Sequence, residues 1–345
     1  MMSGVKLRRK ILQPHKAHRD ARFEVRNVLT NDPFIYVDLW LRRQHEEDAL
    51  FFWRQSGAFY QSARHLPIEA KPLLLYYSFM NAAKALLSAK HIAFNPYHGV
   101  GKHNMRPPGG KMVLSNEGVR IHSKGVLPAI STYYGETETN VTHSLEDMLY
   151  NLVHVHRTYC LTYPRRRDIF LPVRSPEFYR DDATGETFFE ATVVGDVDWE
   201  AYRKNLPAGY QHYPRGVQRI IRSVASVMLT TGNDPPTADL DQLRILNRSI
   251  RSRLKYIRGS STLWYLKMTS PTEIAREPVT LMLGAMHRLS ELSRYHPAQL
   301  SALLNGQRNW LLNEFIAMSP SQFIDEVAAE MTGHQVLVPN VRVPV

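Results

Sequence analysis

Arginine and lysine side chains recur at helical spacing in the second half of the sequence. Five cations are separated by four, three, four and three residues: Arg244, Arg248, Arg251, Lys255 and Arg258. At about 100° per residue, this spacing predicts one charged face on a helix, apart from an apolar face that packs. A shorter series upstream has a similar spacing, at Arg215, Arg219 and Arg222.

Both series predict a surface for an anionic partner. A guanidinium grips phosphate or carboxylate through two hydrogen bonds, so nucleic acid or an acidic protein would suit these residues. The alternative is that the charges meet acidic residues within the fold or face solvent.

Two histidines follow a long apolar segment and could carry acid–base chemistry. His98 and His103 lie with Lys102 and Arg106 in a basic loop, and loops of this kind often hold binding or catalytic residues. The alternative is a turn in which His98 hydrogen-bonds the backbone, since no carboxylate at a base-orienting spacing accompanies it.

The sequence contains no standard metal or cofactor motif. His154 and His156 are two residues apart on an expected helix and would point in different directions. There is no His-Glu-x-x-His motif, no pair of cysteines and no P-loop. We therefore expect neither a metal nor a cofactor.

Composition favours an intracellular protein with anionic partners. The net charge is +11, and arginine supplies most of it, with 31 Arg against 12 Lys. With Cys160 as the single cysteine, no disulfide can form within the chain, which suits the cytoplasm. The most apolar segment, residues 73–87, is shorter than the roughly 20 residues of a membrane-spanning helix, so no membrane association is expected.

Helical periodicity dominates the expected fold. Residues 72–91 carry a broad apolar stripe that predicts a buried helix, packed against a second helix over 280–295 with Lys84 at its margin. The expected fold class is mainly α, a helical bundle-like domain with a small β insertion.

The expected organisation is a basic flexible arm (1–25), one domain (26–335) with loop or strand insertions near 95–140 and 168–199, and a tail (336–345). From residue 214 onward the pattern predicts helices, apart from a loop at 232–236 and a tail after Gly333.

Two stretches far apart in the sequence resemble one family. The segment LLYYSFMNAAKALL at 74–87, followed by Tyr97-His98-Gly99, is similar to the signature of the bacterial YaaC-like family. Downstream, LWYLK at 263–267 and MHRLSELSRYHP at 286–297 resemble that family's C-terminal core helix and its ending. The resemblance spans about residues 30–330.

The first of these helices also resembles HEPN domains, a helical group that includes ribonucleases, toxin components and binding modules of bacterial defence. Catalytic HEPN ribonucleases carry an Arg-x(4–6)-His motif. Only Arg8 and Arg9 stand at that distance from a histidine, His15, and they lie in the expected arm. Arg288 and His296 are one residue too far apart, and they stay candidates for catalysis beside His98 and His103.

These observations lead to one function and two alternatives. We expect a nucleic-acid-binding or partner-binding subunit of a bacterial system, in which a protein partner or a homo-oligomer is plausible and antiphage defence is implied by resemblance alone. A metal-independent, HEPN-like ribonuclease and a structural assembly protein are the alternatives. The sequence favours a non-catalytic protein and leaves catalysis open.

Overall fold

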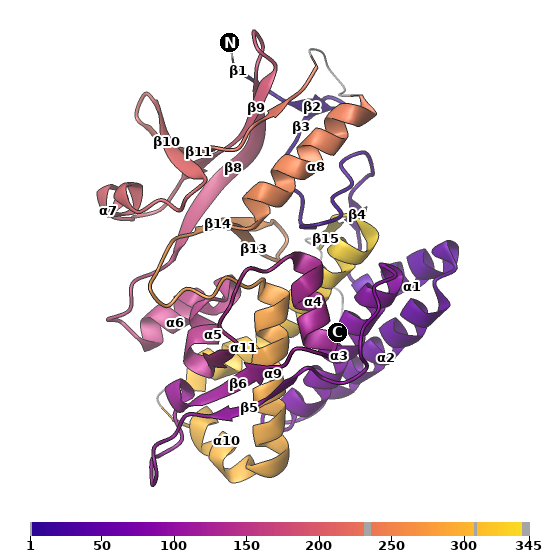
Figure 1. Cartoon of the computed structure of the whole chain (residues 1–345), viewed down its shortest axis with the longest axis vertical. Coiled ribbons are helices and arrows are strands. Elements are labelled where there is room, and N and C mark those ends of the chain that lie inside the picture. The colour runs from indigo at the N-terminus through magenta and orange to yellow at the C-terminus, as the bar shows by residue number, and fades with distance from the viewer. Residues whose placement is uncertain (1, 231–235, 307–308, 340–345) are drawn as a thin grey trace. The chain divides into compact units, whose positions relative to one another are not determined.

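The computed structural model describes residues 2–230, 236–306 and 309–339 of the chain. The chain divides into two compact units, each assembled from separated parts of the sequence (Figure 1). Unit 1 comprises Met1–Asn31, Ile169–Pro271 and Gly333–Val345, and unit 2 comprises Asp32–Asp168 and Thr272–Thr332. This interleaved division differs from the single domain expected over residues 26–335, because no change of composition marks where the chain passes between units.

Unit 2 is mainly helical. Its helices are α1 (Pro33–Gln44), α2 (Glu47–Arg64), α3 (Lys71–Ala89), α4 (Val126–Tyr134), α5 (Leu145–Tyr150), α6 (His156–Thr162), α9 (Pro278–Tyr295), α10 (Pro297–Leu304) and α11 (Asn309–Thr332). A small antiparallel sheet joins them, built from β5 (Val100–Asn104), β6 (Glu117–Ile121) and β7 (Thr142–Ser144).

Helix α3 is the centre of unit 2, as its apolar stripe predicts. It packs against α2, α9 and α11, and the Phe79 and Phe323 rings stack with centroids 4.1 Å apart. Tyr76 and Met80 are each only 3% exposed, and Lys84 is half-buried. The predicted pairing of α3 with α9 is therefore confirmed.

Unit 1 is built on an antiparallel sheet with the strand order β10-β11-β9-β8-β14-β13, in which β1 also pairs with β8 and β12 with β9. The strands are β1 (Met2–Gly4), β8 (Phe170–Asp181), β9 (Glu186–Val193), β10 (Tyr210–Arg215), β11 (Gln218–Ser223), β12 (Val227–Met228), β13 (Leu254–Ile257) and β14 (Leu263–Lys267). Two further pairs are β2 (Lys6–Leu7) with β3 (Lys10–Ile11), and β4 (Val28–Leu29) with β15 (Val336–Leu337).

Helix α8 (Thr237–Arg251) covers one face of this sheet, and a short helix α7 (Trp199–Lys204) lies between β9 and β10 in the sequence. The covered face carries fully buried Phe178, Phe189 and Ile221. On the opposite face Tyr179, Phe188 and Tyr213 are partly exposed.

The predicted fold class is wrong, because the protein is mixed α and β. Eight strands form one sheet within the described part of unit 1, whereas a small β insertion was expected. The spacing of Arg215, Arg219 and Arg222 predicts a helix from residue 214 onward, yet residues 210–223 form the hairpin β10–β11. In so short a segment the spacing of the arginines does not distinguish a helix from a strand. The pairing of two strands decides between them, and a single segment of sequence does not show that pairing.

The N-terminal segment, expected as a flexible arm over residues 1–25, is part of unit 1. Ser3 pairs with Arg180 of β8, and residues 14–18 are buried. In the expected tail, Val336 and Leu337 pair with β4, and residues 340–345 lie outside the described residues.

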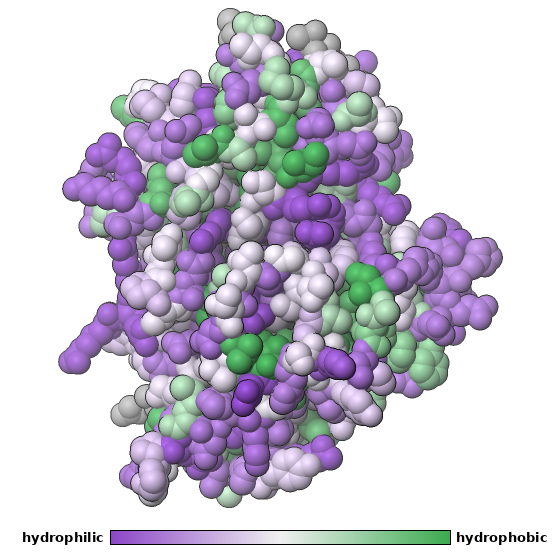
Figure 2. All heavy atoms as spheres, viewed as in Figure 1, coloured by the Kyte–Doolittle hydropathy of each residue, from purple (hydrophilic) through white to green (hydrophobic). Residues whose placement is uncertain are grey.

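No helix among the described residues is long and apolar enough to cross a membrane. Hydrophilic residues cover most of the face shown in Figure 2, and apolar residues appear there as separate patches.

Candidate functional site

The predicted stripe of five cations does not lie on one helix. Helix α8 ends at Arg251, so Lys255 falls on β13 and Arg258 follows that strand. Arg251 is 2% exposed and Lys255 is 3% exposed, which removes both from the surface. The expectation of one exposed cationic helix face is therefore wrong, because the chain turns into a strand where the spacing continues.

The arginines of α8 hold the N-terminal segment instead. Arg244 Nε donates to the Ala21 carbonyl at 2.9 Å, and Arg248 donates to the Arg19 carbonyl at 3.0 Å. Arg251 donates to the Lys16 carbonyl at 3.1 Å.

Asn247, on the same helix, completes this attachment. It accepts the His15 backbone N–H at 2.9 Å and donates to the Ala17 carbonyl at 3.0 Å. The residues of α8 thus hydrogen-bond the backbone of residues 15–21, which form bends and no regular strand in the structure.

The second arginine series lies on β10 and β11. Arg222 is buried and forms an ion pair with Glu190 at 2.5 Å, and its guanidinium lies 3.4 Å from the Tyr213 ring centroid. Arg215 reaches the same carboxylate at 3.0 Å. Arg219 is exposed. Only Arg219 of this series therefore presents its charge fully to solvent.

A basic pocket lies in unit 1, lined by the N-terminal segment and Gln335. It encloses about 730 Å³ and is walled by four cations, Arg8, Lys10, Arg22 and Arg26. No carboxylate is among the described residues that line it. Its walls also carry the amides of Gln13, Asn27 and Gln335.

A second group of functional side chains surrounds His98 in unit 2. The Tyr76 hydroxyl on α3 and His98 Nδ1 share a hydrogen bond, and the two rings stack with centroids 5.5 Å apart. His287, on α9, lies edge-on to Tyr76 at 5.0 Å and 6.0 Å from His98. The packing of α3 on α9 thus brings two imidazoles and a phenol together.

Burial and nearby cations keep these imidazoles neutral. Partial burial, followed by the charge of Lys84, lowers the pKa of His98 below its usual value, while Glu291 opposes this shift. Burial lowers the pKa of His287 to about 3, and neighbouring His98 and Arg288 act in the same direction. Burial also raises the pKa of Tyr76, so its hydroxyl stays protonated.

The backbone of His98 is clamped against the first turn of α4. The Tyr97 carbonyl accepts the Val126 N–H at 2.9 Å, and the His98 carbonyl accepts the Leu127 N–H at 3.2 Å. A Cβ on Gly99 would lie 2.3 Å from Pro128 Cδ, so only glycine permits this approach. His98 is therefore an exposed imidazole on a fixed backbone.

The structure brings together two of the four predicted catalytic candidates. Arg288 lies one residue after His287 and is buried, forming ion pairs with Glu117 of β6 and, at 3.2 Å, with Glu291. His103 lies on β5, where it pairs with Gly118, and half-buried His296 ends α9. Glu291 also lies 3.7 Å from His287, so it links Arg288 to the cluster of Tyr76, His98 and His287.

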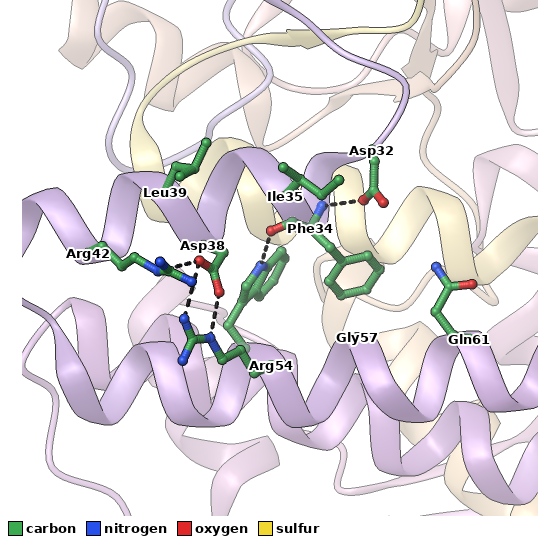
Figure 3. Close-up of a pocket in the computed structure, with 10 residues that line it drawn as sticks. Asp32, Phe34, Ile35, Asp38, Leu39, Arg42, Arg54, Gly57 and Gln61 are labelled. Carbon is green, nitrogen blue, oxygen red and sulfur yellow. Dashed lines mark hydrogen bonds and ion pairs between the residues drawn. The ribbon is translucent and has the colours of Figure 1, made fainter. Parts of the chain in front are cut away.

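A different pocket lies between α1 and α2 (Figure 3). It encloses about 470 Å³ over the Phe34 and Trp53 rings, whose centroids are 5.0 Å apart. Asp38 forms ion pairs with Arg42 at 2.7 Å and with Arg54 at 2.6 Å, as the dashed lines show. Because one carboxylate serves both guanidiniums, this pocket is less suited to an anion than the basic pocket of unit 1.

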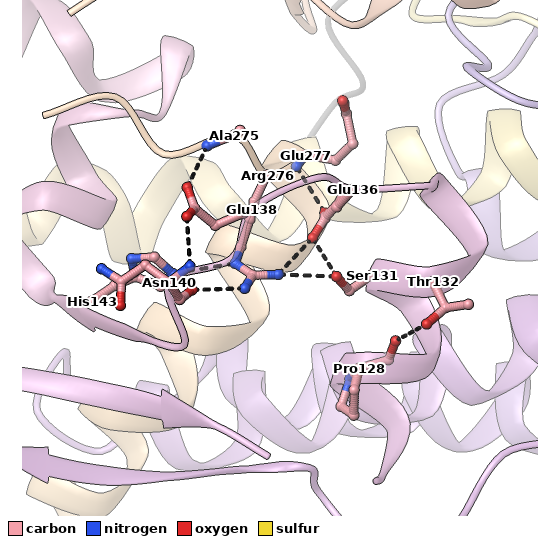
Figure 4. Close-up of polar contacts among 10 residues, drawn as sticks. All are labelled: Pro128, Ser131, Thr132, Glu136, Glu138, Asn140, His143, Ala275, Arg276 and Glu277. Carbon is pink, nitrogen blue, oxygen red and sulfur yellow. Dashed lines mark hydrogen bonds and ion pairs between the residues drawn. The ribbon is translucent and has the colours of Figure 1, made fainter. Parts of the chain in front are cut away.

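A buried ion pair joins the start of α9 to the loop after α4 (Figure 4). Arg276 donates to Glu136 and to Ser131, both at 3.0 Å, and to the Asn140 carbonyl at 3.0 Å. The Arg276 and Glu136 side chains are 4% and 2% exposed. The Arg276 guanidinium is enclosed by these partners, so we assign this network a structural role.

Sequence analysis missed several of these residues. Tyr76 was counted only as part of an apolar stripe, although its hydroxyl needs a partner when buried. His287 adjoins Arg288 in the sequence, and no spacing rule connects it to His98. Lys10, Arg22 and Arg26 were assigned to a flexible arm or left out. Among the described residues, no group of three His, Cys, Asp or Glu side chains could hold a metal ion.

Comparison with known proteins supports the resemblance seen in the sequence. A family model described as YaaC-like Protein matches residues 17–331. Comparisons with curated proteins and with solved structures found no match. The wider resemblance to HEPN domains stays a prediction. Because the match includes α3, the His98 loop and α9 and covers most of the sequence, the chain belongs to the YaaC-like protein family.

Proposed function

We propose that this protein binds nucleic acid through unit 1. The observation that carries this proposal is the distribution of charge. Unit 1 contains 23 lysine and arginine residues against 13 aspartate and glutamate residues, whereas unit 2 contains 20 against 19. Nearly all of the net charge of +11 therefore belongs to unit 1. A concentrated positive charge attracts phosphate backbones and speeds association with them.

The residues proposed for this contact are the exposed members of the predicted series. Arg219 and Arg248 are exposed, and Arg215, Arg244 and Arg258 are half-buried. Arg222, Arg251 and Lys255 are buried and serve the fold. Contacts of this kind give affinity that depends on salt and little choice of sequence.

Fluorescence anisotropy with labelled single-stranded RNA and DNA, across a salt series, tests the proposal. The variant combines Arg174→Glu, Arg219→Glu and Arg248→Glu, all exposed in unit 1. A matched control combines Arg43→Glu, Arg64→Glu and Lys124→Glu, all exposed in unit 2. We expect the first variant to lose about tenfold or more in affinity and to show a shallower salt dependence, and the control to bind nearly as wild type.

Equal losses in both variants, or no binding by the wild-type protein at low salt, would overturn the proposal. Loss of an acidic protein partner in the first variant, with nucleic-acid binding unchanged, would instead favour an assembly function.

A second candidate function, metal-independent ribonuclease activity, is favoured by the fixed imidazole of His98. In the tautomer whose Nδ1–H donates to the Tyr76 hydroxyl oxygen, Nε2 has a lone pair for proton transfer with a substrate. Lys84 and Arg294 both act on the charge of His98, so cations border the site. The proposed step has His98 remove the proton of a ribose 2′-hydroxyl while the 2′ oxygen attacks phosphorus. The bond from phosphorus to the 5′ oxygen breaks, and that oxygen takes the proton from His98.

Cleavage of labelled RNA in the presence of a chelator tests this second function. His98→Ala should abolish cleavage and leave the fold intact, because the side chain is exposed. Tyr76→Phe should reduce cleavage and shift its pH profile, since the hydroxyl orients the imidazole. The second function is excluded if wild-type protein leaves a 2′-hydroxyl substrate uncut, or if it cuts DNA equally well.

A further inference from the structure

We propose that the basic pocket of unit 1 binds a nucleoside phosphate, either free or as the phosphorylated end of a strand. This inference rests on the proposed nucleic-acid binding and deepens it, because it names the ligand class for one site of the same unit. The site is the pocket lined by Arg8, Lys10, Arg22 and Arg26.

The size and chemistry of the pocket fit such a ligand. Its volume of about 730 Å³ lies within the range of small-molecule sites. Its four cations can hold a phosphate, and no carboxylate is among the described residues that line it, although Asp20, outside the lining, lies 3.8 Å from Arg22. Amides from Gln13, Asn27 and Gln335 offer both donors and acceptors for the edge of a base.

One wall of the pocket offers apolar surface to a base. The wall includes Phe23, which is 8% exposed and whose ring lies edge-on to His15 at 5.8 Å and to Phe178 at 5.9 Å. Ile11 is 41% exposed and adds apolar surface. A pocket that combines cations, amides and apolar surface selects a phosphate joined to an organic group over a bare inorganic anion.

The turn that presents Arg8 is strained. Leu7 pairs with Lys10, so Arg8 and Arg9 form a two-residue hairpin loop. Their φ angles are 51° and 67°, as in a type I′ turn, where Asn-Gly is the favoured sequence. Two arginines in left-handed conformations cost stability, and such strain is concentrated at functional sites. The turn does not need arginines, so their presence there indicates a role in binding a ligand.

The cations also come from separate elements that the fold holds in place. Arg8 and Lys10 belong to the β2–β3 hairpin, whereas Arg22 packs its side chain over Gly333, where an added Cβ would lie 2.6 Å from Arg22 Cγ. Val28 beyond Arg26 pairs with Val336. The pocket is thus assembled before a ligand arrives, which lowers the ordering cost of binding.

Replacing the turn with the sequence that its geometry favours separates stability from binding. We take the variant Arg8→Asn/Arg9→Gly, with Arg203→Gln/Lys204→Gln on α7 as a control that removes the same charge from exposed positions outside the pocket. Isothermal titration with the four nucleoside 5′-monophosphates measures affinity, and thermal unfolding measures stability. We expect the variant to bind about tenfold or more weakly and to melt a few degrees higher, and the control to bind as wild type.

A second variant keeps the test independent of the turn. Arg26→Gln removes an exposed cation of the pocket without altering the hairpin, and it should also weaken binding by about threefold or more. The proposal is overturned if wild-type protein binds no nucleoside monophosphate, if inorganic phosphate binds equally well, or if both pocket variants bind as wild type.

Oligonucleotides distinguish the two sources of the ligand. A tetranucleotide with a 5′ phosphate, bound more tightly than free monophosphates and than the same strand with a 5′ hydroxyl, would identify a strand end. Equal affinity for free monophosphates would identify a free nucleotide. If long RNA and DNA do not bind but nucleoside monophosphates do, the proposed nucleic-acid function fails and the pocket inference stands.

Discussion

At the scale of single residues, arginines at the same helical spacing differ in burial and in what they contact. Arg248 and Arg251 belong to the same predicted stripe, yet Arg248 is exposed and Arg251 is 2% exposed. The Arg251 guanidinium lies 5.2 Å from the Tyr256 ring centroid and 5.4 Å from that of Trp264. The sequence indicates a cation at both positions, but burial depends on strands β13 and β14, whose pairing is not encoded in the spacing.

Replacing Arg251 should therefore destabilise unit 1. Arg251→Ala removes hydrogen bonds to the Lys16 and Leu254 carbonyls and leaves those groups buried, so we expect a loss of about 3 kcal/mol in the free energy of unfolding. Arg248→Ala, the matched control, should cost less than about 1 kcal/mol because the side chain is exposed. Urea denaturation checks both values, and equal losses would contradict the assignment.

The cluster at His98 shows the same limit of sequence analysis. His98 could be identified as a candidate because it follows an apolar helix, and Arg288 because of its spacing to His296. His287 could not be linked to His98, because a ring contact between residues 189 positions apart (287 − 98) leaves no local pattern. Tyr76 lies only 22 residues before His98, but its place in the apolar stripe gave no sign of this contact.

The charge of Lys84 should be measurable at His98. Partial burial and then Lys84 lower the His98 pKa, so Lys84→Met, which keeps a similar volume, should raise the His98 pKa toward 6.5. Lys124→Met, an exposed control that does not act on His98, should leave it unchanged. Titration of the imidazole resonances by NMR gives both values, and a decrease in Lys84→Met would refute the charge effect.

At the scale of elements, long periodic helices were predictable and short strands were not. Helices α3 and α9 carry apolar residues over several turns, and their predicted packing is confirmed. The hairpin β10–β11 has only six residues in each strand, and its arginine spacing imitates a helix. Loop geometry was equally hidden, because the approach of Gly99 to Pro128 depends on α4.

Two glycines with the same backbone conformation test that approach. Gly99 and Gly109 have φ angles of 72° and 71°, but a Cβ on Gly109 would meet nothing within 4 Å. Gly109→Ala should cost about 1 kcal/mol, the usual price of a left-handed residue. Gly99→Ala should cost roughly 2–5 kcal/mol, because it adds a clash with Pro128. Chemical denaturation measures both, and similar losses would show that the clamp on His98 is unimportant for stability.

At the scale of the whole molecule, buried neutral histidines set a common response to pH. Burial lowers the pKa of His15, His154 and His287 to about 3 and of His143 to about 4. These side chains come from both units, so the response is not confined to one site. No motif in the sequence predicts this response to pH, because the burial of a histidine depends on residues that pack around it in the folded protein.

Stability should therefore fall as pH decreases below about 6.5. The unfolded chain takes up a proton on each of these histidines near pH 6.5, whereas the folded chain does so only near pH 3 to 4. Each histidine contributes up to about 1.4 kcal/mol per pH unit within that window. Urea denaturation at pH 7.5 and pH 5 measures the slope. His154→Gln should make the slope shallower by one proton, and a slope unchanged from wild type would contradict this account.

The basic pocket has a further consequence for synthesis of the protein. Its walls include Arg8, near the start of the sequence, and Gln335, near its end. During translation the first wall leaves the ribosome long before the second, so a partial chain cannot form the pocket. Charged ligands would then meet the complete pocket only after residue 335 has been added to the chain. A premature stop between residues 27 and 335 would yield fragments that retain the four cations of the pocket but lack Gln335.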